Sequence, residues 1–176
     1  GFHVAFIATH MPGVIAVCGL SSVVSGWSLG LIGLFNIVGS IFAGWYISYK
    51  SMRYFLFYIY MSRSVIVLLF LLSPKDLISI LFFSAALGFT FFSVIPATAG
   101  LIGKMFGARF MATLFGFALF SHQIGGFLGA YFGGYFFMLT GDYTVFWLLD
   151  AGLAIVAAFV HLPIKESSVF QVPKIT

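Results

Sequence analysis

Charged side chains are scarce in this chain. Only 8 of the 176 residues are Lys or Arg and 4 are Asp or Glu, which together make up 7% of the sequence. Because a soluble domain usually carries about 25% charged residues, this composition excludes an ordinary water-exposed surface. The mean hydropathy of +1.16 and the 62% share of hydrophobic residues indicate a protein whose surface contacts lipid.

Cysteine and catalytic motifs are also nearly missing. The single Cys18 cannot form an internal disulfide. The sequence contains no glycine-rich phosphate loop, no Gly-x-Ser-x-Gly and no His-Glu-x-x-His. The basic residues form no stripe or patch of the kind that binds nucleic acid. We therefore expect neither an enzyme nor a nucleic-acid-binding protein, and we expect no cofactor and no bound metal.

Six apolar stretches account for almost the whole chain. A helix needs about 20 apolar residues to cross a bilayer, whereas barrel strands are about 10 residues long and alternate in polarity. These stretches are longer and do not alternate, so the sequence predicts an all-α transmembrane bundle in a single domain over 1–164, followed by a tail over 165–176. The first stretch is short for a crossing, and we expect the chain to begin inside a longer protein. The predicted spans are 1–18, 22–48, 54–73, 77–100, 110–139 and 144–162.

The basic residues predict the orientation of these spans. Lys and Arg accumulate in the cytoplasmic loops of membrane proteins. Six spans place all but one of the basic loop residues on the same side, and only Lys75 falls on the other. The sequence therefore predicts an integral protein of the cell (inner or plasma) membrane with a cytoplasmic C-terminus. The residues on the predicted cytoplasmic side are Lys50, Arg53, Lys104, Arg109, Lys165 and Lys174.

Glycine and proline predict how the helices pack. Small residues at a spacing of four let two membrane helices approach closely, and Pro96 predicts a kink in 77–100 because it lacks a backbone N–H. We expect close helix contacts along two glycine-rich faces. One face, in 110–139, contains Gly125, Gly126, Gly129, Gly133 and Gly134, and the other, in 22–48, contains Gly26, Gly30, Ser40 and Gly44.

A weak internal repeat relates these two glycine-rich spans. The segments 34–44 and 119–129 share a Leu-Phe start followed by similarly spaced glycines, with one insertion between them. Each segment lies in the second helix of a set of three, and the two sets run in opposite directions. Inverted repeats of three helices are typical of secondary transporters.

Polar side chains on several spans fall at a common depth. At about 1.5 Å per residue, Arg63 lies about 15 Å from Arg53, and Asn36 lies about 21 Å from Lys50. By the same rise, Ser93 lies about 16 Å from Lys104, and His122 and Gln123 lie about 20 Å from Arg109. Transporters bind their substrates near the midplane. The candidate substrate-binding residues are therefore Arg63, His122, Gln123, Asn36, Ser93 and His10, which shares a helix face with His3.

The residues leave alternative roles open for the ionisable groups within the spans. Arg63 clamps a substrate anion through its guanidinium, pairs with Asp150, or reaches toward the membrane surface or water. His122 either carries a proton or donates a hydrogen bond to a neighbouring helix, and His122 and Asp150 are the candidates for proton coupling. Two histidines seven residues apart, His3 and His10, make a poor metal site without a nearby carboxylate.

Four segments resemble the C-terminal half of major facilitator superfamily (MFS) transporters of the monocarboxylate and oxalate/formate-antiporter type. Residues 1–13 resemble the seventh helix of that family, and 33–40 resemble the eighth. Residues 105–116 and 120–126 resemble the loop into the eleventh helix and that helix itself. The resemblance implies one half of a twelve-helix symporter or antiporter.

The resemblance also implies a function and partners. Such a protein moves a small solute by alternating access, here an organic anion such as a monocarboxylate, with a proton or by exchange. Its partners are the lipid bilayer, the small-molecule substrate, and an N-terminal six-helix half or a second copy of the chain. The alternative is a membrane scaffold or assembly subunit that transports nothing.

Overall fold

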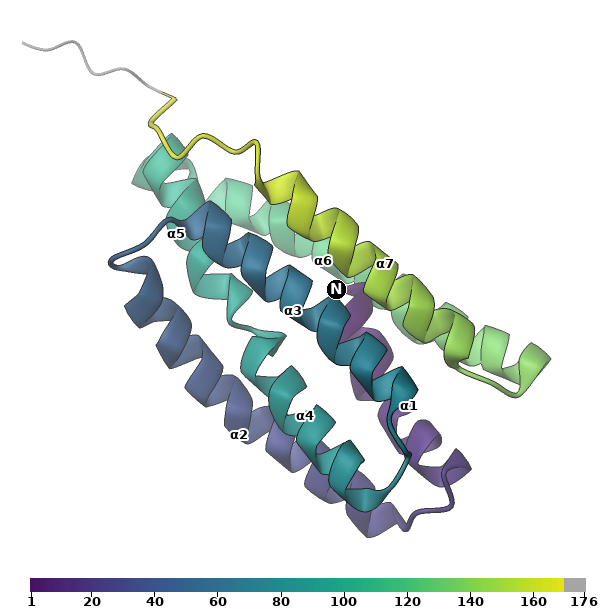
Figure 1. Ribbon diagram of the computed structural model, residues 1–176. Helices are drawn as coiled ribbons and strands as arrows, with labels where there is room; N and C mark the ends of the chain where they lie inside the picture. Colours follow the sequence, from purple (N-terminus) through teal and green to yellow (C-terminus); the bar gives the residue numbers. More distant parts are fainter. Residues whose placement is uncertain (170–176) are drawn as a thin grey trace, which may run out of the picture.

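The computed structural model describes residues 1–169, and all regular structure in that range is helical. The predicted all-α bundle is therefore confirmed. Its helices run side by side along the length of the molecule (Figure 1). They are α1 (Phe2–Val17), α2 (Ser22–Ile47), α3 (Met52–Leu72), α4 (Leu77–Phe91), α5 (Val94–Phe106), α6 (Ala108–Thr140) and α7 (Thr144–His161).

The lengths of these helices suit a bilayer. Five segments are long and apolar enough to cross a membrane, if α4 and α5 are taken together as Leu77–Phe106. The shorter α1 starts at mid-length of the bundle (Figure 1). Large apolar side chains such as Trp27 on α2 and Phe120 on α6 are 66% exposed. Such surfaces are stable against lipid or another protein surface, and together with the length of the helices they indicate a membrane-spanning bundle.

Three helix pairs make the most extensive contacts: α1 with α6, α2 with α4, and α3 with α7. The pairing is symmetric if α1–α3 form one set and α4/α5, α6 and α7 form the other. The first helix of each set packs against the second helix of the other set, and the two third helices pack together. A two-fold relation between inverted three-helix repeats requires contacts that match in this symmetric way, so the contacts support the repeat seen in the sequence.

The glycine face of α6 packs closely on α1, as the sequence predicts. A Cβ atom added at Gly129 would overlap the carbonyl oxygen of Phe2, and one added at Gly133 would lie 2.7 Å from the His10 ring. Gly129 and Gly133 are the two buried residues of α6. Glycine at these positions therefore sets the distance between α1 and α6.

The predicted glycine face of α2 is wrong within this chain. Cβ atoms added at Gly26, Gly30 and Gly44 would meet nothing within 4 Å. The close approach of α2 to α4 depends on Gly39, which faces the carbonyl of Phe89, and on Gly88, which faces Ile32. The four-residue spacing correctly predicts a row of small residues on α2, but it does not predict which side of α2 faces α4.

The helix expected over 77–100 is two helices. α4 ends at Phe91 and α5 begins at Val94, and α5 continues to Phe106. Pro96 has no N–H to donate to the carbonyl of Phe92 four residues earlier. That carbonyl accepts a shorter-range bond from the N–H of Ile95, at 3.0 Å. The kink expected from Pro96 is thus an interruption, which we call the α4–α5 break (92–93).

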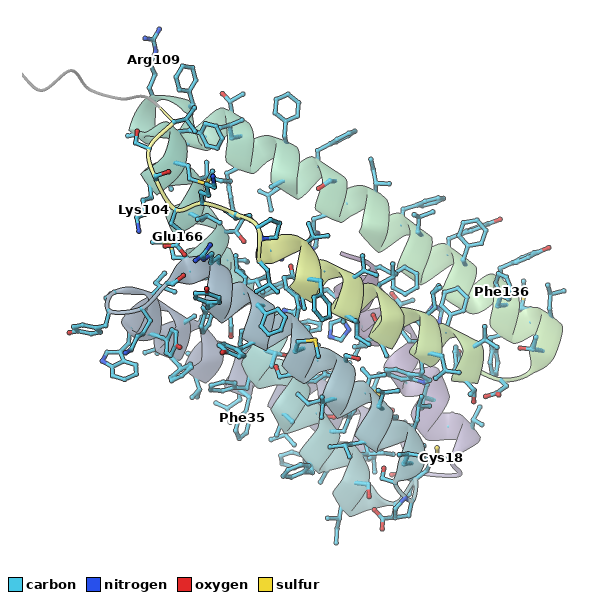
Figure 2. All side chains as sticks on the ribbon, turned by 45° about the horizontal axis from the view of Figure 1, so that its top comes forward. Cys18, Phe35, Lys104, Arg109, Phe136 and Glu166 are labelled. Atoms are coloured by element: carbon cyan, nitrogen blue, oxygen red, sulfur yellow. The ribbon has the colours of Figure 1, made fainter. Side chains whose placement is uncertain are left out.

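The tail returns to the end of the bundle where the basic residues gather. Glu166 accepts hydrogen bonds from the Arg53 N–H at 2.8 Å, from the Ser51 hydroxyl, and from the Lys104 ammonium at 3.1 Å. Figure 2 shows Lys104, Arg109 and Glu166 at this end, far from Cys18. Residues 170–176 of the predicted tail, including Lys174, lie outside the described residues.

These contacts alter the acidity of Glu166. Burial raises the pKa of its carboxyl, but hydrogen bonds from Ser51, Arg53 and Lys104 outweigh burial and hold the pKa below the ordinary value of 4.5. A carboxyl with a lowered pKa stabilises the folded state above its ordinary pKa, and this contribution is lost as the pH falls through the lowered value.

We expect Glu166 to hold the tail at neutral pH and to release it in acid. The Val169 N–H donates to the Met105 carbonyl at 2.8 Å, so the hydrogen-exchange protection factor of that amide reports attachment of the tail. Protection should fall as the pH drops below 4.5, and Glu166→Gln should lower it at pH 7. Asp142→Asn, at the opposite end of the bundle, is the control and should change nothing. Unchanged protection in Glu166→Gln would contradict the assignment.

We expect Gly129→Ala to loosen the contact between α1 and α6. The added methyl group must displace the backbone at Phe2, and overpacking of this kind costs about 1–3 kcal/mol. Thermal unfolding of the detergent-solubilised protein should therefore begin at a lower temperature. The matched control is Gly30→Ala, which faces open space and should leave the unfolding temperature unchanged or higher. Equal unfolding temperatures for the two variants would show that the contact between α1 and α6 accommodates the added methyl group without cost.

A buried polar cavity as the candidate functional site

A histidine and a carboxylate from opposite ends of the sequence meet inside the bundle. His3 on α1 and Asp150 on α7 are joined by a 2.6 Å contact between Nδ1 and Oδ2. Asp150 is 1% exposed and His3 is 8% exposed. An ionised carboxylate only accepts hydrogen bonds, so the contact places a proton on Nδ1 when Asp150 is charged.

Arg63 on α3 is bound to backbone carbonyls. Its Nη2 donates to the carbonyl of Phe91 at 2.7 Å and to the carbonyl of Thr90, and the residue is 4% exposed. In a continuous helix these carbonyls would accept from residues four positions later. The α4–α5 break leaves them without those donors, so Arg63 supplies the missing hydrogen bonds.

Of the roles that the sequence leaves open for Arg63, the direct ion pair with Asp150 is not formed. Among the described residues the acidic partner of His3 is Asp150, and no ion pair joins Asp150 to Arg63. The two charges still interact electrostatically across the cavity that both residues line. The backbone carbonyls of the α4–α5 break hold the guanidinium through Nη2 instead.

Two other predicted site residues lie at the same break. The Asn36 side-chain oxygen accepts from the Phe92 N–H at 3.0 Å, which supplies the acceptor lost where α4 ends. The buried Ser93 hydroxyl donates to the Phe89 carbonyl. Asn36, Arg63 and Ser93, predicted at a common depth on three spans, are thus brought together around one backbone interruption.

A cavity of about 190 Å³ lies beside Arg63. Three of the side chains that line it have a buried polar atom without a hydrogen-bond partner among the described residues: His3 Nε2, Arg63 Nε and Asp150 Oδ1. Buried polar groups are normally paired with protein or water, and this volume has room for waters or a small solute. The lining residues are Gly1, Phe2, His3, Tyr60, Arg63, Asp150, Leu153, Ala154 and Ala157.

The remaining predicted residues lie outside this cavity. His10 Nε2 is 2.8 Å from the carbonyl of Ala130 and ties α1 to α6. His122 is half-buried on α6, and Gln123 beside it is exposed. Neither contributes to the cavity lining. The described residues contain no group of three or more His, Cys, Asp or Glu side chains that would hold a metal ion.

Sequence reasoning missed the role of His3. The sequence suggested no carboxylate near His3 and His10, but Asp150 is the partner of His3 across 147 positions. The available signal was the scarcity of charge, because Asp150 is the one acidic residue within a span. A buried carboxylate in lipid requires a partner, and a histidine on another span is a suitable one.

Comparison with known proteins supports a transporter. No family model matches the chain. The chain is 28% identical over 151 residues to a protein of Bacillus subtilis (strain 168) described as "Uncharacterized MFS-type transporter YcxA". The matched region covers 82% of this chain and 36% of the relative, so the chain spans about a third of that protein. This similarity supports membership of the major facilitator superfamily and a role in membrane transport.

We expect Asn36→Ala to destabilise the α4–α5 break. Removing the side-chain oxygen leaves the Phe92 N–H without its acceptor, and a buried unpaired donor costs about 1–3 kcal/mol. Hydrogen exchange of the peptide 89–95 should therefore accelerate about fivefold or more. The control is Ser121→Ala, whose hydroxyl bonds only to its own helix at Ala118. Unchanged exchange in Asn36→Ala would show that the break does not depend on this bond.

Proposed function

We propose that this chain is the C-terminal six-helix half of an MFS secondary transporter. It moves a small organic anion, such as a monocarboxylate, by alternating access, either with protons or by exchange. The similarity to an MFS-type transporter and the symmetric pairing of the two helix sets support the transporter class.

The placement of Arg63 supports an anionic substrate. A cation this deeply buried is costly in a membrane and usually marks a solute pathway. The two carbonyls that Arg63 contacts hold the guanidinium in position but do not neutralise its charge. Its Nε remains unpaired beside a cavity of about 190 Å³. A carboxylate is the natural acceptor for such a donor, because charge-assisted bonds to carboxylates suit the guanidinium geometry.

The α4–α5 break supports alternating access. Discontinuous helices occur where the backbone lines a transport path, since broken backbone is tolerated in a membrane only where other groups satisfy it. Arg63 and Asn36 belong to α3 and α2, so motion of either helix acts directly on the break. Substrate bound at Arg63 would thereby influence the geometry of the spanning segment.

The uncovered helices support a larger assembly. Only 6% of the most apolar window of α6 and 17% of that of α2 are buried. We propose that an N-terminal six-helix half or a second copy of the chain covers part of this surface and that lipid covers the rest. The protein belongs to the cell membrane, with its tail and basic loops in the cytoplasm.

We expect Arg63→Gln to abolish uptake of monocarboxylates by the complete polypeptide reconstituted in proteoliposomes. Losing charge-assisted bonds of about 1.5–3 kcal/mol each should weaken binding by roughly 10- to 100-fold. The measurement is the initial uptake of radiolabelled lactate and propionate. The control is Arg109→Gln, which makes the same charge change at an exposed position and should keep uptake.

Because Arg63 also holds the α4–α5 break, a second variant separates its two roles. Arg63→Lys keeps the charge and a donor for the carbonyls but loses the planar fork, so it should insert and fold while transporting with a raised KM. Full uptake by Arg63→Gln would refute the anion-binding role.

A further inference from the structure

We infer that an apolar groove between α3 and α4 binds one acyl chain of a zwitterionic phospholipid, whose head group lies against Lys75 and Asp76. The inference goes beyond the proposed function, because it concerns a lipid on the outside of the bundle and not the transported solute. It starts from two cavities that lie along the neighbouring helices α3 and α4 (Figure 1).

The two cavities form one groove, which we call the α3–α4 groove. A cavity of about 140 Å³ lies toward the α3–α4 loop, and one of about 510 Å³ lies toward the α4–α5 break. They share the lining residues Ile66 of α3 and Phe82 and Ala86 of α4. Phe82 is 76% exposed and Leu69, which also lines the groove, is 61% exposed. The groove therefore opens to the outside of the bundle, where lipid contacts it.

The length of the α3–α4 groove matches one leaflet of a bilayer. Ser79 lines the groove near the loop and Thr90 lines it near the break, eleven positions further along α4. At about 1.5 Å per residue the two positions are about 16 Å apart, which is half of a hydrocarbon core of about 30 Å. An acyl chain that belongs to the leaflet on the Lys75 side has the length and the apolar surface to lie along this groove.

A positive charge lies at the loop end of the groove. The Lys75 ammonium donates to the carbonyls of Phe70 at 2.5 Å and Ser73 at 2.7 Å, and both residues line the groove. It also contacts the carbonyl of Leu71 at 3.1 Å and lies 4.8 Å from the centroid of the Phe70 ring. Carbonyls hold the ammonium in place without neutralising it, and among the described residues no acidic side chain forms an ion pair with it.

A negative charge lies beside it. Asp76 accepts a hydrogen bond at 2.8 Å from the backbone N–H of Ser79, which lines the same end of the groove. This bond holds the pKa of the Asp76 carboxyl below its ordinary value of 3.8, so the side chain is charged at neutral pH.

These two charges specify the head group. A phosphate oxygen is a stronger acceptor for the Lys75 ammonium than a neutral carbonyl, and a primary amine on the same lipid can donate to Asp76. An anionic head group offers only the first of these contacts and places a second negative charge near Asp76. The pair therefore favours a phospholipid with an amine, such as phosphatidylethanolamine, over an anionic lipid with the same acyl chains.

The inner end of the groove reaches the α4–α5 break. Phe89 and Thr90, in the last turn of α4, line the larger cavity. The Thr90 carbonyl is one of the two that Arg63 contacts. The end of a bound acyl chain therefore packs against the turn of α4 whose backbone Arg63 holds.

The test is binding of phosphatidylethanolamine to the purified complete polypeptide in detergent, followed by native mass spectrometry. The wild type should bind one lipid per chain at this site. Ala86→Phe places a ring where the two cavities join, and it should weaken binding about fivefold or more, because a lipid that enters beside the ring overpacks the groove. The control is Val65→Phe on α3, which adds a ring at a position that is 49% exposed and lines neither cavity.

The head-group assignment has its own variant. The wild type should prefer phosphatidylethanolamine to phosphatidylglycerol of the same acyl chains by about two- to fivefold, the range of one exposed ion pair. Asp76→Asn keeps an acceptor for the Ser79 N–H at the start of α4 and should remove this preference. Asp142→Asn makes the same charge change in the α6–α7 loop and should keep it.

Three results would overturn the inference. They are unchanged lipid binding in Ala86→Phe, an equal loss of binding in Val65→Phe, and an unchanged head-group preference in Asp76→Asn. A wild-type dimer that Ala86→Phe dissociates would also overturn it, because the groove would then be covered by a second copy of the chain.

A second measurement needs no variant and covers the case in which Ala86→Phe does not fold. A phosphatidylethanolamine with a photoreactive group in its acyl chain should label the peptide that contains Ala85 and Ala86 in wild-type proteoliposomes. Unlabelled phosphatidylethanolamine should compete with this labelling more strongly than phosphatidylglycerol does. Labelling at Val156, which is 60% exposed on α7, should respond equally to both lipids. Equal competition by the two lipids at the groove would contradict the inference.

Discussion

The structure depends on one constraint, which is that a membrane interior offers no water to a broken helix. At the α4–α5 break the N–H of Phe92 and the carbonyls of Thr90 and Phe91 lose their helical partners. Asn36 and Arg63 replace those partners from α2 and α3. Because each unsatisfied backbone group in hydrocarbon costs several kcal/mol, the break and these two side chains form a single unit.

Using a cation at the break has an electrostatic consequence. Carbonyl dipoles orient a guanidinium but leave its full charge in the interior, and a buried charge requires compensation nearby. Asp150 provides it across the cavity, and His3 holds Asp150 in place through a hydrogen bond. A structural demand of the backbone thus leads to a charged cavity, which the proposed transport of an anion requires.

The helical bundle could be predicted from the sequence because the patterns that indicate it extend over many residues. Apolar stretches of helical length, and basic residues at alternate ends, depend on many positions at once, and Pro96 marked the region of the break. Contacts between particular side chains were harder to predict. Gly26 and Gly30 have the same spacing of four as Gly129 and Gly133, yet both face open space, as does Gly44. Spacing identifies the residues of one helix face but not the neighbour toward which that face points. The scarcity of charge makes Asp150 a candidate partner of Arg63, but it gives no sign of the backbone carbonyls that the break frees and that Arg63 contacts.

Under the proposed function, Arg63 links the backbone of the bundle to the bound substrate, because its nitrogens serve different partners. Nη2 is bound to the backbone at the α4–α5 break, while Nε is unpaired beside the cavity. A ligand that draws Nε toward itself must also change the bonds made by Nη2, because the guanidinium is rigid and planar. In the proposed transporter, a substrate bound at Nε would therefore change the bonds that fix the angle between α4 and α5. This arrangement gives a ligand different interaction energies in two helix geometries, which is the physical requirement for a solute to drive a conformational change.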